Sequence, residues 1–195
     1  MLFDLLILLA TSAHSELDDA ELSLRIREGD KEAFEQFFHS THQKLIAYLK
    51  SRGLSGDEAQ DITQQAYLYI WEKREDIDPE KSLRSFLFRI GYTRMLNRFR
   101  DTKKFSSDDV EESTFAGSRE TQPDSSAEHQ DLKKHLQKAI RTLPEKRREV
   151  FELCFLQQLS YKEAAEVMEV TPKTIENHML RAYKDIREKL KGFAD

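Results

Sequence analysis

The chain has 195 residues, of which 34% are charged and one is cysteine, and its formal net charge at pH 7 is −5. This length allows one or two domains, while a single cysteine excludes an internal disulfide and is typical of a reducing compartment. Long amphipathic runs with only 6 glycines and 4 prolines predict an all-α fold.

The first residues, MLFDLLILLATSAHS, carry an apolar run of about ten residues, which is too short to span a bilayer. A secretory signal peptide begins with basic residues, whereas the first charge here is Asp4, so the small residues Ala10 to Ala13 leave only a weak case for cleavage. We interpret residues 1–16 as a packed or frayed appendage, or as the product of a start codon placed too early. A helix that touches a membrane is the remaining alternative.

Residues 17–104 are expected to form a first helical domain. A helix should begin at Asp18–Glu21 and end near Gly29–Asp30, where a second helix starts. The residues that should face the core of this pair are Leu22, Ile26, Ala33, Phe34, Phe37, Phe38, Leu45, Ile46, Tyr48 and Leu49.

A third helix should follow Gly56 and carry a polar and an apolar face. Its apolar positions are Ala59, Ile62, Ala66, Tyr69 and Ile70. The opposite face carries Asp57, Glu58, Asp61, Gln64, Gln65 and Glu72. Residues 57–80 hold eight acidic and two basic side chains, so this face is either simply solvated or docks on a basic helix.

The next helix, from Ser82 to about Arg100, has two apolar stripes on nearly opposite sides. One stripe comprises Leu83, Phe86, Leu87 and Ile90, and the other comprises Phe88, Tyr92, Met95 and Phe99. Residues 81–104 hold eight basic side chains and one acidic side chain. Aromatic rings among arginines suit stacking on unpaired bases beside phosphate contacts. A helix that is buried on both sides is the alternative.

Residues 105–127 are rich in Ser, Asp, Glu and Thr and lack apolar periodicity, which predicts a flexible acidic linker. Residues 128–195 should form a second small helical domain. Its first helix carries Leu132, Leu136, Ala139, Ile140 and Leu143, and a helix after Pro144 carries Val150, Phe151, Cys154 and Phe155. Cys154 lies in the run VFELCFL, which favours a small buried hydrophobe over a reactive thiol.

Residues 160–190 have the pattern of a helix-turn-helix. Adjacent Ala164 and Ala165 allow close packing of the two helices, and Val170 should plug the turn. Glu169 stands where the backbone is commonly left-handed. Thr171 can cap the second helix, and Pro172 suits its first position. The buried face of that helix should comprise Ile175, Met179, Ala182, Ile186 and Leu190. An ordinary helical hairpin is the alternative.

The opposite face of this second helix should meet DNA. The first residues of a recognition helix reach base edges, and its flanks hold phosphates. The candidates for base contact are Lys173, Thr174, Glu176 and Asn177, and those for phosphate contact are Arg181 and Lys184. No nucleotide-binding loop, catalytic triad or metal cluster is evident. His39 and His42 lie one helical turn apart but lack further ligands, so we expect no metal, no cofactor and no small-molecule substrate.

Five sequence blocks in this order resemble bacterial extracytoplasmic-function sigma factors, which are subunits of RNA polymerase. The blocks are GDKEAFEQFF at 29–38, DEAQDITQQAYLYIWEK at 57–73, SFLFRIGYTRMLNRFR at 85–100, LPEKRREVFEL at 143–153, and the helix-turn-helix. Together they cover the chain except for the appendage and the linker. The resemblance implies two helical domains, 17–104 and 128–195, joined by a linker that threads toward the polymerase active site.

The resemblance also implies roles for particular residues. The residues in the segment that binds core polymerase are Asp61, Gln64, Gln65, Tyr67 and Trp71. Those in the segment that opens and reads the minus-ten element are Arg84, Phe88, Arg89, Tyr92, Arg94, Arg98 and Arg100. Phe86, Tyr92-Thr93 and Asn97 depart from the family's usual Trp, Arg-Asn and Asp, which leaves the exact base contacts open. The helix-turn-helix would read the minus-thirty-five element.

The resemblance implies a cytoplasmic, non-enzymatic protein whose partners are core RNA polymerase, promoter DNA and an anti-sigma factor. The main alternative is a helix-turn-helix regulator of the quorum-sensing or response-regulator kind, because KTIENH is similar to its recognition helix. That alternative requires an upstream receiver or ligand domain with strands, and no alternating strand pattern precedes the linker. An enzyme or a membrane protein with an incidental helical hairpin has no supporting chemistry.

Overall fold

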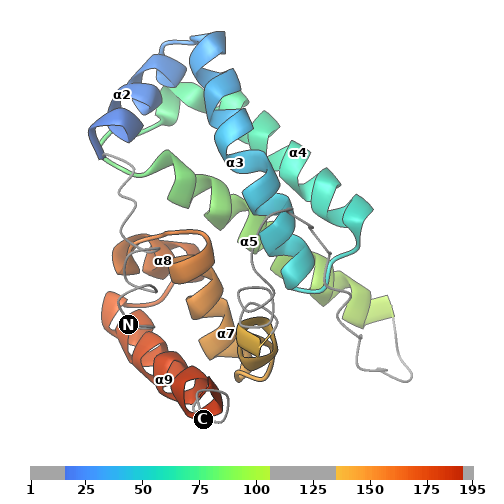
Figure 1. Cartoon of the computed structure of the whole chain (residues 1–195). Coiled ribbons are helices and arrows are strands. Elements are labelled where there is room, and N and C mark those ends of the chain that lie inside the picture. Colours follow the sequence, from blue (N-terminus) through green and yellow to red (C-terminus); the bar gives the residue numbers. More distant parts are fainter. Residues whose placement is uncertain (1–15, 106–134, 191–195) are drawn as a thin grey trace, which may run out of the picture. The chain divides into compact units, whose positions relative to one another are not determined.

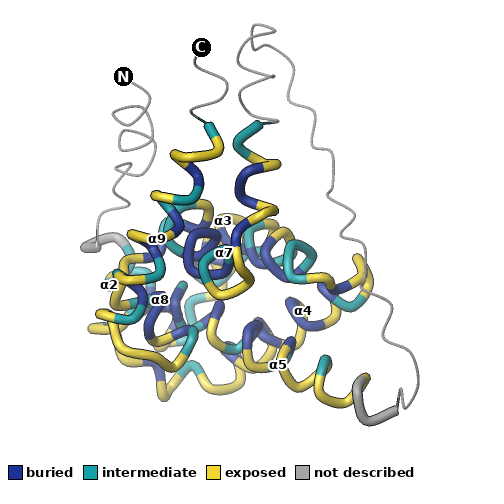
Figure 2. The backbone as a smooth tube through the Cα atoms, turned by 90° about the horizontal axis from the view of Figure 1, so that it is seen from below, coloured by how far each residue is buried: buried dark blue, intermediate teal, exposed yellow. Residues whose placement is uncertain are grey.

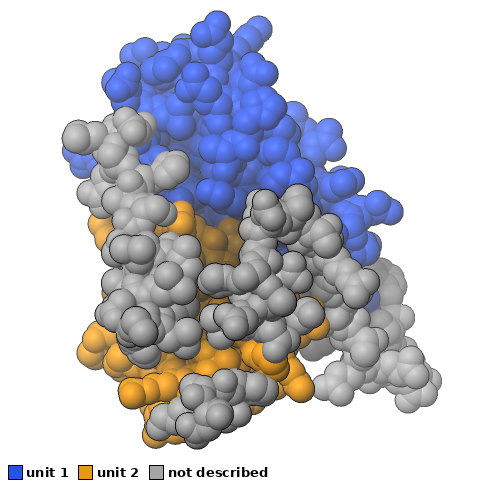
Figure 3. Space-filling view, viewed as in Figure 1, with its two compact units in different colours: residues 1–117, 166–168 blue, residues 118–165, 169–195 orange. Residues whose placement is uncertain are grey.

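The computed structural model describes residues 16–105 and 135–190. Every regular element within these two ranges is helical, which confirms the all-α prediction (Figure 1). The chain divides into two compact units, residues 1–117 with 166–168 and residues 118–165 with 169–195 (Figure 3). The predicted appendage, apart from Glu16, and the predicted linker, apart from Phe105, lie outside the described residues.

The first unit contains four long helices in its described part. These are α2 (Glu16–Arg27), α3 (Lys31–Ser51), α4 (Gly56–Glu72) and α5 (Leu83–Phe105), with a short 3₁₀ turn, η1 (Arg74–Asp76), after α4. Local signals set the boundaries. Gly29 adopts a φ of 89°, and the Asp30 carboxylate then caps α3 by accepting the backbone N–H of Glu32 and Ala33. Ser55 and Glu58 form a capping box at the start of α4.

The core of the first unit lies where α3, α4 and α5 pack against one another (Figures 1 and 2). Its fully buried large side chains are Leu45, Tyr48, Leu49, Ile70, Leu87, Phe88 and Met95, together with Ile26 of α2. Gly91 permits the close approach of α5 to α3, because a Cβ atom there would lie 2.8 Å from Leu45 Cδ1. Among the predicted core positions, Tyr69 is wrong, since it is 39% exposed, and Leu22, Phe34, Phe38 and Ile46 are only half-buried. The side of α4 that faces α3 and α5 is already filled by Ala66 and Ile70, both fully buried.

The second unit contains a helical segment at 135–141, then α7 (Glu145–Phe151), a short π-helical turn η2 (Glu152–Leu156), the first five residues of α8 (Tyr161–Met168) and α9 (Pro172–Leu190). A capping box between Ser160 and Glu163 starts α8. Arg147 of α7 pairs with Asp185 of α9 at 2.5 Å, and Phe151 meets Tyr183 edge-on with 5.9 Å between ring centroids. These contacts hold α9 against α7.

The turn between α8 and α9 follows the helix-turn-helix prediction in its backbone. Glu169 is left-handed, with φ 56° and ψ 43°, and the Thr171 hydroxyl accepts the N–H of Thr174 at 3.2 Å. Ile175, Met179, Ala182 and Ile186 are buried as predicted, whereas Leu190 is half-buried. The predicted plug is wrong, because Val170 is 39% exposed. Val167 and Ile175, both fully buried, fill the interior of the turn instead.

The left-handed backbone at Glu169 leads to a stability prediction. A residue with a Cβ atom pays about 1 kcal/mol for this conformation, and glycine does not. We expect Glu169→Gly to be more stable than Glu169→Ala by about 1 kcal/mol, measured by urea unfolding. Both variants lose the Glu169 side chain, so their difference isolates the backbone. Equal stability of the two variants would show that the strain is absent.

Candidate functional site

Most side chains on the polar face of α4 are exposed. Asp57, Asp61, Gln64, Gln65 and Glu72 are exposed, and Glu58 is half-buried. The Asp61 carboxylate accepts a hydrogen bond from Gln65 Nε2 at 2.9 Å. This geometry leaves a row of carboxylates and amides available to a basic partner.

One edge of this face is bonded to α5. Arg98 Nε donates to Glu58 Oε1 at 2.9 Å, and Arg94 Nη1 donates to Gln65 Oε1 at 2.9 Å. The backbone N–H of Ser55 and then the Arg98 guanidinium lower the pKa of the Glu58 carboxyl. The structure therefore brings together Gln65, from the predicted polymerase-binding group, and Arg94, from the predicted DNA-binding group.

An apolar groove of about 680 Å³ runs between α3 and α4. Its apolar lining consists of Phe34, Phe38, Ile46, Tyr67, Leu68 and Trp71. Leu68 is 55% exposed, and the sequence analysis missed it, although it lies one helical turn beyond Gln64 and close to Trp71. The half-buried Trp71 lies beneath the Arg74 guanidinium, 4.9 Å from the ring centroid. The groove therefore borders the polar face of α4.

The structure corrects the prediction for Tyr67, which is only 4% exposed. Its hydroxyl lies 2.7 Å from Thr41 Oγ1 of α3, and burial raises the pKa of this phenol. The Tyr67 side chain therefore forms part of the wall of the groove. It has almost no surface with which to contact a partner.

Two aromatic residues of α5 also require correction. Phe88 is 0% exposed and Tyr92 is 5% exposed, so neither ring can reach a base in this structure. The Phe88 ring packs on Tyr48 of α3, with 5.6 Å between centroids. The physical reason is that α5 packs against both α3 and α4, so residues of both of its apolar stripes are buried. The alternative of a helix buried on both sides is the correct one.

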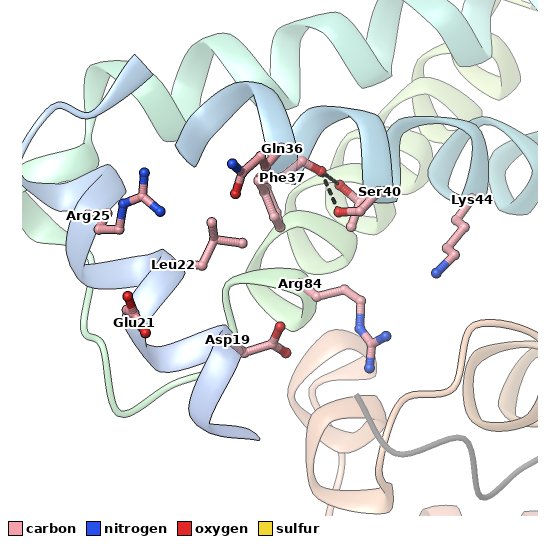
Figure 4. A pocket seen from close by; sticks show the side chains of 10 residues that line it. Asp19, Glu21, Leu22, Arg25, Gln36, Phe37, Ser40, Lys44 and Arg84 are labelled. Atoms are coloured by element: carbon pink, nitrogen blue, oxygen red, sulfur yellow. Dashed lines mark hydrogen bonds between the residues drawn. The ribbon is translucent and has the colours of Figure 1, made fainter. Parts of the chain in front are cut away.

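The arginines of α5 differ in accessibility. Arg89, Arg98 and Arg100 are exposed, and Arg84 and Arg94 are half-buried. Arg84 lines a polar pocket of about 340 Å³ between α2, α3 and α5, together with Lys44 of α3 (Figure 4). Burial and then the nearby Arg84 lower the pKa of the Lys44 ammonium. Lys44 was not predicted as a partner of Arg84, because forty residues separate the two along the chain.

The exposed face of α9 carries the residues predicted to meet DNA. Lys173, Asn177, Arg181 and Lys184 are exposed, and Thr174 and Glu176 are half-buried. Lys173 Nζ pairs with Glu176 Oε2 at 2.8 Å. The structure thus places all six predicted residues on α9, clear of its buried side.

Cys154 is half-buried in η2. Burial raises the pKa of its thiol from the usual 9.0 to about 12. We expect iodoacetamide at pH 8 to alkylate the native chain roughly 1,000-fold more slowly than the urea-unfolded chain, because the raised pKa suppresses the reactive thiolate. The native rate should rise as the pH approaches 11. Equal rates for the two states would contradict this reading.

The raised pKa of the Cys154 thiol also lowers the free energy of unfolding above pH 9, because only the unfolded thiol ionises there.

No cluster of metal-binding side chains occurs among the described residues. In the same part of the chain, no helix is both long and apolar enough to cross a bilayer.

Known families match both units. Residues 37–105 match Sigma-70 region 2, and residues 134–186 match Sigma-70, region 4. These two matches span more than half of the chain and lie in the order that the sequence blocks predicted. The chain belongs to the sigma-70 family. It is a sigma factor of the extracytoplasmic-function group, so it binds core RNA polymerase and directs it to promoters.

Curated relatives cover most of this sigma factor. The RNA polymerase sigma factor NccH of Alcaligenes xylosoxydans xylosoxydans is 28% identical over 168 residues, which are 84% of this chain and 90% of the relative. The ECF RNA polymerase sigma-E factor of Haemophilus influenzae is 26% identical over 184 residues, which are 90% of this chain and 96% of the relative. Sigma factors are transcription initiation factors.

A solved structure shows the same fold. The sigma factor RpoE from Bartonella quintana, in complex with the anti-sigma factor NepR, is 24% identical to this sigma factor. The match has a TM-score of 0.60 and covers 81% of this chain and 96% of that one.

Proposed function

We propose that residues 17–104 bind core RNA polymerase through the exposed face of α4. The contacting residues are Asp61, Gln64, Gln65 and Trp71, while Tyr67 supports them from the groove wall. The observation that carries this proposal is the exposure of Asp61, Gln64 and Gln65 on α4 beside an apolar groove. A basic amphipathic helix of the polymerase would match both features.

We propose that the same domain contacts the minus-ten element through the arginines of α5. These are Arg84, Arg89, Arg94, Arg98 and Arg100, and Lys44 joins them beside Arg84. Phe88 and Tyr92 are left out because they are buried. Arg94 and Arg98 already bond to α4, so their contact with DNA is coupled to the polymerase-binding face.

Residues 128–195 are proposed to read the minus-thirty-five element with α9, and residues 105–127 to connect the two domains. Lys173, Thr174, Glu176 and Asn177 would contact bases, and Arg181 and Lys184 would contact phosphates. DNA affinity without polymerase should be low, because each basic surface is small and the net charge is −5.

We further propose that the chain acts in the cytoplasm, is not an enzyme and needs no cofactor. An anti-sigma partner is included because a related sigma factor, RpoE of Bartonella quintana, was solved with the anti-sigma factor NepR.

Run-off transcription with purified core polymerase tests this function. A genomic fragment library should yield discrete transcripts only when the full chain is added, and the chain should co-purify with core polymerase. If neither occurs, the proposed function is wrong.

A further inference from the structure

Leu180 is an apolar side chain on a polar surface. It lies on α9 and is 59% exposed, the highest value among the exposed large hydrophobic residues of the described part of the chain. Its neighbours one helical turn away are Asn177 and Lys184, and Arg181 follows it directly; all three are exposed.

The position of Leu180 on the helix places it with the DNA-facing residues. At 100° per residue, the buried stripe of Ile175, Met179 and Ile186 points to one side of α9. Lys173, Asn177 and Lys184 point to the other side. Leu180 lies seven residues after Lys173, which is two helical turns, and so shares its side of the helix.

The chemistry of the major groove gives such a residue one natural target. Base edges there present hydrogen-bond donors and acceptors, and the thymine C5-methyl is the one apolar group among the four bases. We propose that Leu180 packs against a thymine methyl in the minus-thirty-five element and so selects thymine at that position. This rests on the proposed role of α9 in reading that element.

A protein partner fits this position less well. A protein interface would present a contiguous apolar patch at its centre, whereas Leu180 is flanked by Asn177, Arg181 and Lys184. The same cations would hold phosphates on either side of the groove, which would bring the leucine down onto the bases.

The experiment removes a single methyl group from the promoter DNA. Full-length chain with core polymerase is first used to select minus-thirty-five sequences from a randomised promoter library. Each thymine of the selected element, on both strands, is then replaced by uracil, which lacks only the C5-methyl. Holoenzyme binding to each duplex is measured for the wild type and for Leu180→Ala.

We expect one thymine at which uracil weakens wild-type binding about fourfold, the effect of one buried methyl group. Leu180→Ala should bind the thymine and uracil duplexes equally. Leu156→Ala, which removes another exposed leucine (50%) outside α9, should behave as the wild type. Lys184→Ala should weaken binding to both duplexes alike and reduce the salt slope by about 1, as expected for a phosphate contact.

Three results would overturn the inference. The first is a selected element in which no replacement of thymine by uracil weakens wild-type binding. Another is a methyl effect that persists in Leu180→Ala. The third is a Leu180→Ala variant that loses affinity for core polymerase while keeping its base preference, which would make Leu180 part of a protein interface. Failure of the proposed function looks different, because then the wild-type holoenzyme enriches no sequence at all.

Discussion

We expect Asp61→Arg to weaken binding of this sigma factor to core RNA polymerase by about 100-fold, because like charges that face each other across the interface proposed for α4 cost several kcal/mol. Asp61 is exposed on α4, and the hydrogen bond that it accepts comes from Gln65 on the same helix. An arginine at this position displaces nothing in the core, so the fold and the unfolding temperature should stay close to those of the wild type.

Glu80→Arg is the matched control for this charge reversal. Glu80 is exposed in the loop between η1 and α5 and lines no part of the groove. This variant makes the same change of charge away from α4 and should bind core polymerase within about threefold of the wild type, as a surface charge remote from an interface does. Affinity can be measured by titrating labelled chain with core polymerase. Equal losses in both variants would mean that net charge, and not the face of α4, governs binding.

Phe88→Ala lowers the free energy of unfolding of the first unit by about 3–5 kcal/mol, the usual cost of removing a buried phenylalanine. Its ring is 0% exposed and packs on Tyr48, so truncation leaves a cavity between α3 and α5. Thr93→Ala, at an exposed position of the same helix, should change stability by at most about 0.5 kcal/mol. Urea unfolding measures both.

Phe88→Leu separates a role in the core from a role on DNA. Leucine fills much of the same volume and should cost less than about 1.5 kcal/mol. Promoter binding by the holoenzyme should stay at the wild-type level, because no aromatic face is presented to the bases. A large loss of promoter opening by a folded Phe88→Leu variant would restore the stacking role that the aromatic rings among the arginines of α5 suggested.

Patterns among neighbouring residues were sufficient to predict the helices of this fold. The capping residues Asp30, Ser55 and Thr171 each bond to backbone within three residues, and the left-handed turn at Glu169 depends on local backbone geometry. The buried stripe of α9 follows from its period alone. All of these features depend on residues that are neighbours in the sequence, so they could be predicted from the sequence.

Residues whose role depends on several helices at once were harder to assign. The periodicity of α5 showed two apolar stripes and left open whether the second was buried or used. Only its packing against both α3 and α4 decided that Phe88 and Tyr92 are buried. The same holds for Tyr67, whose hydroxyl meets Thr41 of another helix, 26 residues away in sequence.

The order of the sequence motifs was enough to identify a two-domain helical sigma factor and to locate the polar face of α4 and the helix-turn-helix. The reason is that amphipathic period, capping and charge segregation are properties of neighbouring residues. The tertiary structure alone decided which aromatic rings are accessible, that Arg94 and Arg98 bond to α4, and that an apolar groove borders the acidic face. Burial and contacts between helices depend on which faces meet in space, and that is settled by packing the whole unit.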